Sequence, residues 1–314
     1  MPPRHWTVAP ADAGSRLDKW LAAQDRAGSR ARALDALARG RVFLDDREQG
    51  TDDAGRRVEA GQRVRLWLDR PGSAARKGPR REGALDIVFE DDLLLVVNKP
   101  PGLLTVPVAS RPDETSVTDL IAGHWRSHRL RDPLVVHRID RDTSGLVVFA
   151  KEGAAWKTLK TQFLRREPER VYRAVVEGVP SPATGTWRDW LRWSPGSLRT
   201  EQAARRAPHA REAITHYTVD ETFGAAALMT FRLESGRRHQ VRVQAWLHGH
   251  PLAGERMYRD AGAQPAIDFP RQALHAARLG FVHPKTARPV RFEAPLPADF
   301  RKLLASLRRG SPRA

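Results

Sequence analysis

The chain has 314 residues and no cysteine, which excludes disulfide bonds, thiolate catalysis and cysteine-based zinc sites. Its 54 lysine and arginine residues outnumber the 37 aspartate and glutamate residues, giving a net charge of +17. Such a charge favours polyanionic partners, of which nucleic acid is the first candidate. An anionic membrane is the alternative, but the sequence has neither a long basic amphipathic helix nor a lipidation signal.

Neither membrane insertion nor secretion is expected from the pattern of apolar residues. No apolar run approaches the roughly 18 residues that suggest a membrane-spanning helix. Residues 1–10 lack the apolar stretch of a signal peptide. We therefore expect a cytoplasmic protein and, by default, a monomer.

Residues 1–71 predict a small α+β domain with two helices. Ser15 is suited to be the N-cap of the first helix, with Asp18 three residues later as a capping-box-like partner. The apolar face of this helix is Leu17, Trp20 and Leu21. The second helix is predicted to begin at Ser29 and to end at Gly40. Its inward-facing residues are Leu34 and Leu37.

Short strands are predicted after the second helix, around Val42 to Leu44 and Val64 to Leu68. Three segments then stand in a familiar order: Ser15-Arg16-Leu17-Asp18-Lys19, Ser29-Arg30 and Gly40-Arg41-Val42-Phe43-Leu44. This order is similar to the S-four type RNA-binding module. The resemblance implies that a basic helix face contacts RNA phosphates through Arg30, Arg32 and Arg41. A solvated helix face with scattered arginines is the alternative.

Residues 72–85 predict a basic flexible linker, because glycine, proline and serine there oppose regular structure. From residue 86 to residue 300 we expect a second domain of the α+β class, with a mixed, largely antiparallel sheet. Apolar runs predict a hairpin at 87–97, helices at 117–125 and 156–164, and strands at 134–136, 146–149, 171–176 and 228–233. Residues 301–314 are expected to form a basic tail that begins as a helix and then frays.

Residues 137–145 form a polar loop between two apolar strands. Loops held by a rigid sheet often carry reactive groups. An arginine on each side of Asp140 is expected to lower the carboxyl pKa by roughly 1–3 units and to keep it ionised. Nucleophilic catalysis requires an ionised carboxylate. A polar turn, in which Asp140 or Asp142 caps backbone amides, is the alternative.

The whole segment from His137 to Leu146, His-Arg-Ile-Asp-Arg-Asp-Thr-Ser-Gly-Leu, is similar to the signature of RluA-type pseudouridine synthases. Further segments resemble the family's other motifs in the right order: Asn98-Lys99-Pro100-Pro101-Gly102, Arg170-Val171-Tyr172-Arg173-Ala174, Gly236-Arg237-Arg238-His239-Gln240-Val241-Arg242, Gly249-His250-Pro251-Leu252-Ala253-Gly254-Glu255, Leu274-His275-Ala276 and Phe281-Val282-His283-Pro284. The chain departs from the family pattern at four positions. Ile139 stands where Leu is commoner, and Arg170 where Lys is usual. Arg238 stands where Thr or Ser is common, and Glu255 where Asp is usual.

The resemblance implies the pseudouridine synthase fold and an isomerase that acts on RNA without a metal or cofactor. Such enzymes cleave the glycosidic bond of a uridine, rotate the base and rejoin it through carbon five. Asp140 would be the nucleophile, and Arg242 would pair with it. Tyr172 would stack on the uracil and serve in proton removal. Arg138 would fill the space that the flipped uridine leaves.

Structured RNA of the large ribosomal subunit is the favoured substrate, and tRNA is the alternative. A different class of function is an RNA-binding ribosome-assembly factor with weak or no catalysis. The Asp142-Thr143-Ser144-Gly145 segment faintly resembles an aspartic protease motif, but no second such loop supplies the required carboxylate partner. The histidines at 239, 248 and 250 fit no metal-ligand spacing.

Overall fold

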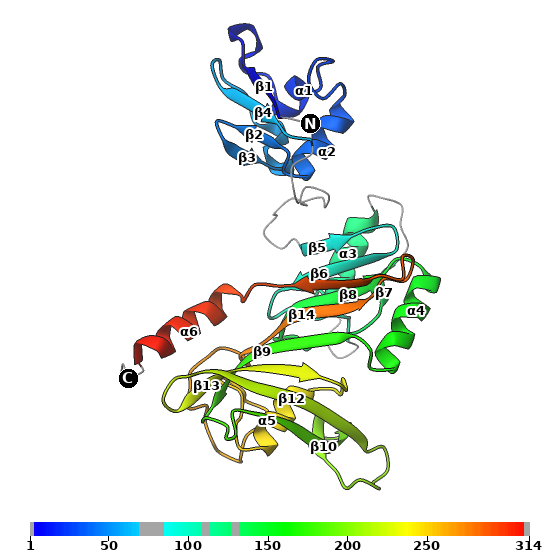
Figure 1. Cartoon of the computed structure of the whole chain (residues 1–314), viewed down its shortest axis with the longest axis vertical. Coiled ribbons are helices and arrows are strands. Elements are labelled where there is room, and N and C mark those ends of the chain that lie inside the picture. The colour runs from blue at the N-terminus through cyan, green and yellow to red at the C-terminus, as the bar shows by residue number, and fades with distance from the viewer. Residues whose placement is uncertain (1–2, 69–84, 109–113, 127–131, 311–314) are drawn as a thin grey trace. The chain divides into compact units, whose positions relative to one another are not determined.

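The computed structural model describes residues 3–68, 85–108, 114–126 and 132–310 (Figure 1). The chain divides into two compact units, Met1–Glu90 and Asp91–Ala314. The predicted linker at 72–85 lies outside the described residues except for Leu85. Within the described ranges, no helix is long and apolar enough to cross a bilayer.

The first unit folds two short helices onto a small sheet. Its elements are β1 (Arg4–Thr7), η1 (Pro10–Asp12), α1 (Leu17–Leu21), α2 (Arg30–Ala38), β2 (Val42–Leu44), β3 (Arg47–Gln49), η2 (Thr51–Gly55) and β4 (Arg63–Leu66). The four strands are ordered β1-β4-β2-β3. Leu17, Leu21 and Leu37 of the helices are fully buried against Val42 and Leu66 of the sheet.

Two local predictions for this unit are wrong. Ser15 is not an N-cap, because Arg16 occupies that position in α1 without a side-chain cap. Asp18 is instead a buried carboxylate that accepts hydrogen bonds from Arg16 and Arg30. Leu34 is 37% exposed, because the core side of α2 is formed by its alanines and Leu37. The predicted N-cap of α2 is confirmed, since Ser29 Oγ accepts from the Arg32 amide.

The larger sheet is built from eleven strands within the described ranges. These strands are β5 (Asp86–Glu90), β6 (Leu94–Lys99), β7 (Leu134–Val135), β8 (Ser144–Ala150), β9 (Glu169–Glu177), β10 (Thr184–Ser194), β11 (Arg199–Gln202), β12 (Arg211–Thr222), β13 (Ala226–Leu233), β14 (Leu274–Val282) and β15 (Pro289–Glu293). The main path runs β11-β10-β12-β13-β9-β14-β8-β6-β5, with β15 on β14 and β7 on β8. β14 runs parallel to β8 and antiparallel to β9. The expected mixed, largely antiparallel α+β fold is confirmed.

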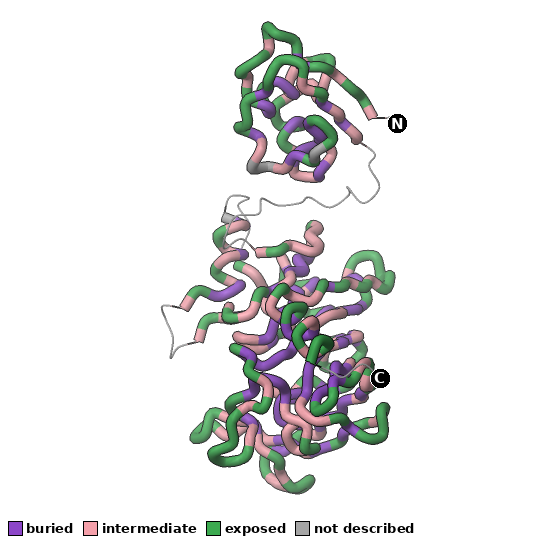
Figure 2. The backbone as a smooth tube through the Cα atoms, turned by 90° about the vertical axis from the view of Figure 1, so that its left-hand side faces the viewer, coloured by how far each residue is buried: buried purple, intermediate pink, exposed green. Residues whose placement is uncertain are grey.

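In the part of the chain that the structure describes, four helices accompany this sheet: α3 (Val117–Arg126), α4 (Gly153–Leu164), α5 (Gln240–Leu247) and α6 (Ala298–Gly310). α5 buries Val241 and Ala245 against β9 and β13. α6 buries Phe300, Leu303 and Leu304 in another cluster on the sheet. The expected start of a tail at residue 301 therefore falls inside a packed helix, and residues 311–314 lie outside the described part. Figure 2 shows the buried residues gathered in the interior of the second unit, with exposed residues at its outer loops.

The close approach of β8 and β14 depends on a glycine. Gly145 has a φ of +116°, and a Cβ atom there would lie 2.2 Å from the carbonyl oxygen of Ala276. Only glycine fits such a contact without a shift of the backbone. Ala276 is paired with Gly145 on one side and with Tyr172 of β9 on the other. Because Gly145 allows β8 and β14 to approach so closely, Tyr172 lies beside the loop that precedes β8.

Two histidines of this unit, the fully buried His275 and the half-buried His137, are held in the neutral form by their hydrogen bonds. His275 Nε2 donates to the Ala294 carbonyl, so Nδ1 is free to accept from Ser144 Oγ at 2.9 Å. His137 Nε2 accepts from the Val148 amide and therefore carries no proton. Burial lowers the pKa of His137 to about 3 and the pKa of His275 to about 4.

These histidines make the folded state sensitive to acid. Their pKa values lie below the unfolded value of about 6.5, so the unfolded chain binds more protons as the pH falls. The stabilisation is complete above about pH 6.5 and is lost as the pH falls toward about 4 for His275 and about 3 for His137. We expect each histidine to contribute a slope of up to ~1.4 kcal/mol per pH unit in this window. Urea unfolding at several pH values measures the slope, and an unchanged slope in His275→Gln would contradict this account.

Candidate active site

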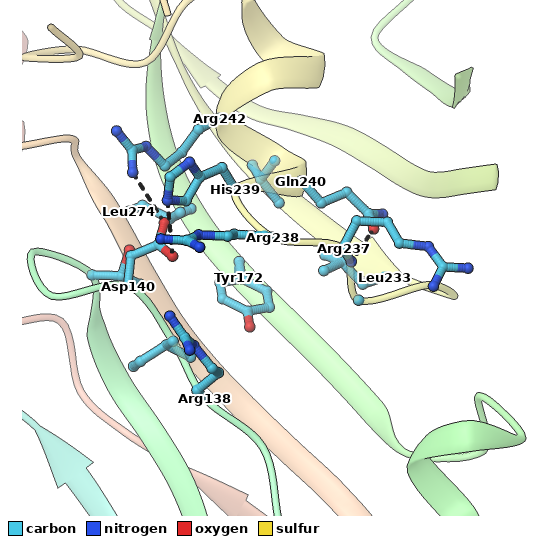
Figure 3. Close-up of a pocket in the computed structure, with 14 residues that line it drawn as sticks. Arg138, Asp140, Tyr172, Leu233, Arg237, Arg238, His239, Gln240, Arg242 and Leu274 are labelled. Carbon is cyan, nitrogen blue, oxygen red and sulfur yellow. Dashed lines mark hydrogen bonds and ion pairs between the residues drawn. The ribbon is translucent and has the colours of Figure 1, made fainter. Parts of the chain in front are cut away.

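Asp140 lies in the loop between β7 and β8, at the base of a cavity (Figure 3). Its side chain is 22% exposed, so it is open to a ligand but not surrounded by solvent. Arg242 Nη1 donates to its Oδ2 at 3.2 Å. His239 Nε2 lies 3.7 Å from the other carboxylate oxygen. A cation and an imidazole therefore hold this carboxylate from the side of α5.

Arg242 is itself clamped by a second carboxylate. Its Nε and Nη2 donate to the two oxygens of Glu255 at 2.7 and 2.9 Å, which leaves Nη1 for Asp140. Burial alone would lower the pKa of Arg242, but Glu255 and Asp140 outweigh burial and raise it. The pKa of Glu255 is lowered because Arg242 outweighs the opposing effect of burial. The guanidinium is therefore always charged and has one orientation. The longer side chain of Glu255, compared with the usual aspartate, is compatible with a two-bond pairing.

Gln240 fixes the start of the helix that carries Arg242. Its Oε1 accepts from Ser235 Oγ and the Arg237 amide, and its Nε2 donates to Ile214 O and Thr215 Oγ1. All these contacts are buried or partly buried. Because both ends of the amide are used, α5 begins at a defined place beside β12.

Lys99 anchors the Asp140 loop from the opposite side. The residue is fully buried at the end of β6. Its Nζ donates to the carbonyl oxygens of Pro100, Leu103 and Arg141, at 3.0, 2.7 and 2.6 Å. Burial lowers its pKa to about 7, against the opposing charges of Asp142 and Asp140. Three carbonyl acceptors require all three hydrogens of an ammonium group, so the backbone next to Asp140 is held by a single side chain.

The cavity in front of Asp140 has a volume of about 270 Å³. Its lining includes Tyr172 of β9 and four arginines: Arg138, Arg237, Arg238 and Arg242. Burial, reinforced by the charge of Asp140, raises the pKa of Tyr172 despite the opposing effect of Arg170. The phenol therefore keeps its proton at neutral pH. One carboxylate, a neutral phenol and several guanidinium groups suit a polar, anionic ligand with an aromatic ring.

The four predicted site residues of the second unit meet in this cavity, which Asp140, Tyr172, Arg242 and Arg138 all line. The flanking arginines, however, do not contact Asp140 as expected. Arg141 pairs with Asp142, its neighbour in the chain, and with Glu114, while Arg138 is exposed at the cavity wall. The cation on Asp140 is the distant Arg242, which the loop sequence alone does not reveal.

Arg30, Arg32 and Arg41 lie in the first unit, on or just after α2. Arg32 is exposed, and Arg30 is 64% exposed although it bonds to the buried Asp18. Because Asp18 is held in the core, it fixes the position of the Arg30 guanidinium at the surface.

Sequence reasoning assigned no role to Lys99, His239 or Arg238. Lys99 gave a usable signal, since a lysine at the end of a strongly apolar strand must be buried with its partners. For His239 and Arg238, the sequence held no signal beyond their place in a motif. His239 contacts Tyr258 and Arg238 contacts Trp193, and both contacts join segments that are distant in the sequence.

The three histidines considered for a metal site have separate partners. His239 Nδ1 contacts the Tyr258 hydroxyl, His248 Nε2 contacts Asp189, and His250 Nδ1 contacts the Glu177 carbonyl. Among the described residues, no group of three or more potential metal-binding side chains comes together.

Removing the charge of Glu255 should destabilise the fold. Glu255→Gln leaves the buried Arg242 with one weak partner in place of a two-bond ion pair. We expect the free energy of unfolding to fall by about 3 kcal/mol. Glu293→Gln is the matched control, because Glu293 is 64% exposed and its pairing with Arg278 is a surface contact. Equal urea midpoints for the two variants would contradict the clamp.

Residues 93–246 match the family described as RNA pseudouridylate synthase. An uncharacterized RNA pseudouridine synthase of Synechocystis is 34% identical over 97% of this chain and 93% of that protein. The ribosomal large subunit pseudouridine synthase D of Xanthomonas campestris is 35% identical over 99% of this chain and 94% of that protein.

A solved structure shares the fold. It is human RNA pseudouridylate synthase domain containing 4, with a TM-score of 0.60 and 23% identity over 71% of this chain and 92% of that chain. The relatives match nearly the whole chain, as the resemblance to RluA-type enzymes implied. The chain belongs to the RNA pseudouridine synthase family.

Proposed function

We propose that this enzyme converts a uridine of large-subunit ribosomal RNA to pseudouridine, with Asp140 as the catalytic carboxylate. The single observation that carries the catalytic assignment is the 3.2 Å contact between Asp140 and the clamped Arg242 at the base of an open cavity. The ribosomal target is supported by the name of the Xanthomonas campestris relative, which matches both units of the chain. The same reaction on tRNA is the competing substrate choice.

The reaction is an isomerisation, so no oxidant, reductant or co-substrate is consumed. The bond between N1 of uracil and C1′ of ribose breaks, and a bond between C5 and C1′ forms. C5 loses its proton and N1 gains one. Each route to this product needs an ionised carboxylate oxygen beside the nucleotide. We propose that Arg242 keeps Asp140 aimed at the nucleotide, and that a metal or cofactor is not required.

Tyr172 is proposed to stack on the uracil ring. The residue lines the cavity with Asp140, and stacking on an aromatic face contributes roughly 1–3 kcal/mol per base. Because the phenol is protonated at neutral pH, it would first act as a hydrogen-bond donor. It would then have to pass its own proton on before taking the proton from C5.

Arg138 is proposed to fill the gap in the RNA that the extruded uridine leaves. The side chain is exposed and belongs to the cavity wall, two residues before Asp140. Extruding a base costs a few kcal/mol in lost stacking and pairing. A guanidinium in the vacated space offsets part of this cost through its own stacking and hydrogen bonds.

The first unit is proposed to be an S-four type module that binds structured RNA through Arg30, Arg32 and Arg41. Arg30 is supported by its exposure and by its fixed orientation on Asp18. Arg32 is exposed in the first turn of α2. We further propose that the enzyme acts as a monomer in the cytoplasm.

Asp140→Asn tests the catalytic assignment. The amide keeps the shape of the side chain but has no charge and is a poor nucleophile. We expect pseudouridine formation to fall by roughly a thousand-fold or more, with RNA affinity retained. Mass spectrometry of ribosomal RNA from cells with the native gene, the variant or neither provides the measurement. Asp92→Asn, at an exposed carboxylate beside β6, is the control and should behave as native. Absence of a modified uridine with the native gene would favour the RNA-binding assembly factor.

Tyr172→Phe separates stacking from proton transfer. The variant keeps the aromatic ring and removes the hydroxyl. We expect kcat to fall by roughly a hundred-fold or more, because general acid–base groups contribute on that scale, and KM to stay unchanged. Tyr172→Leu should in addition raise KM, since it removes the stacking surface. Initial rates on an RNA fragment provide both constants, and an unchanged kcat in Tyr172→Phe would leave stacking as the sole role.

Salt dependence tests the basic surface of the first unit. Each neutralised phosphate releases counterions, so RNA affinity should fall linearly with salt on logarithmic axes. Arg32→Ala is expected to make this slope shallower by about one. Filter binding of ribosomal RNA between low and high salt measures it. A slope identical to that of the native protein would remove Arg32 from the proposed contacts.

A further inference from the structure

A second pocket opens beside the first and shares the Asp140 loop with it. It has a volume of about 330 Å³. The side chains common to both pockets are Arg138, Ile139, Asp140, Arg238, His239 and Arg242. The second pocket lacks Tyr172 and has apolar walls of its own. These apolar side chains come from two parts of the chain: Leu104, Val106 and Val108, and Leu198 and Met257. The polar residues Thr105, Arg141, Asp142 and Gln272 also line only the second pocket.

One apolar wall is formed by the turn between β10 and β11. Leu198 lies in this turn, is 63% exposed and has a φ of 52°. A left-handed backbone is unfavourable for leucine, and strain of this kind clusters at functional sites. Neither burial in the core nor the turn geometry explains a large apolar side chain here. A ligand that covers Leu198 would explain it.

Three contacts fix this turn to the rest of the pocket. Thr200 Oγ1 donates to the Arg238 carbonyl at 2.9 Å, and the Thr200 amide donates to the Tyr258 hydroxyl at 2.9 Å. Arg199 Nη2 donates to the carbonyl of Met257. The segment that carries Leu104 is fixed to the Asp140 loop, since Thr105 Oγ1 donates to the Ile139 carbonyl at 2.7 Å. Both walls are therefore held by hydrogen bonds at a set distance from Asp140.

Arg238 stands at the boundary between the two pockets. Its guanidinium lies 3.5 Å from the ring centroid of Trp193, so it is held flat although the side chain is exposed. The positive charges shared by the two pockets come from Arg138, Arg238 and Arg242. Two cavities that meet at one carboxylate under several cations match two linked nucleotides with a phosphate between them.

We propose that the second pocket binds the base of the nucleotide next to the target uridine, between Leu198 and the wall at Leu104. This proposal rests on the proposed function and deepens it, because the neighbour would be extruded together with the target. The phosphodiester bond keeps neighbouring nucleotides adjacent, so a base in the first pocket places its neighbour at the mouth of the second. Apolar side chains can pack against the face of any base, so this pocket would not select one base over another.

The test uses a ribosomal RNA fragment that contains the modified uridine, and two versions in which the base on its 5′ or 3′ side is absent. With the native protein, we expect one of the two abasic fragments to lower kcat/KM by about ten-fold, the scale of one lost base contact. Leu198→Ser should lower kcat/KM by a similar factor on the intact fragment. On the abasic fragment, Leu198→Ser should cause no further loss, because both changes remove the same contact.

Leu164→Ser is the matched control, because Leu164 is 81% exposed at the end of α4 and lines neither pocket. It should act as the native protein on all three fragments. The proposal is overturned if the native protein modifies all three fragments equally well. It is also overturned if Leu198→Ser loses the same factor on abasic and intact RNA. Absence of pseudouridine from every fragment with the native protein would instead overturn the proposed function.

Discussion

The arrangement of the site depends on one guanidinium that is shared by two carboxylates. Glu255 takes two of the Arg242 donors and leaves the third for Asp140. Without Glu255 the arginine could rotate, and without Arg242 the sheet would hold a partly buried carboxylate with no cation. The Lys99 ammonium completes the support, because it holds the backbone on the far side of the loop. Arg242 thus fixes the side chain of Asp140, and Lys99 fixes the main chain next to it.

The local parts of this arrangement could be predicted from the sequence. The polar loop between two apolar runs located Asp140, and the spacing of apolar residues located α3, α4, β8, β9 and β13. The flanking arginines expected from the loop do not pair with Asp140, because Arg141 contacts its neighbour Asp142. The pairing of Arg242 with Asp140, which the family resemblance implied, is confirmed. The contact between Arg242 and Asp140 joins residues 102 positions apart and requires α5, which no periodicity revealed. Burial of Asp18 also escaped prediction, because a capping carboxylate and an ion-paired core carboxylate have the same sequence signature.

Rigidity and exposure are combined at both pockets. The sheet, Gln240 and Lys99 immobilise the groups that surround Asp140, whereas Arg138, Arg238 and Leu198 are exposed at the rim. An RNA ligand would therefore meet a preformed pocket floor and exposed side chains at the rim. Pre-organisation of this kind reduces the entropy that binding must overcome.

The insertion of β14 between β8 and β9 has a consequence for biogenesis. β14 spans Leu274–Val282, more than a hundred residues after β8, yet it joins the strand that follows the Asp140 loop to the strand that carries Tyr172. Such long-range pairing closes slowly, because the intervening chain must first be ordered. When translation has reached residue 270, β8 and β9 belong to two separate groups of strands, because the strand that joins them has not been made. Each group then has an open edge. Asp140 and Tyr172 are therefore not held together until β14 has emerged, and the open strand edges are exposed to misassociation during that interval.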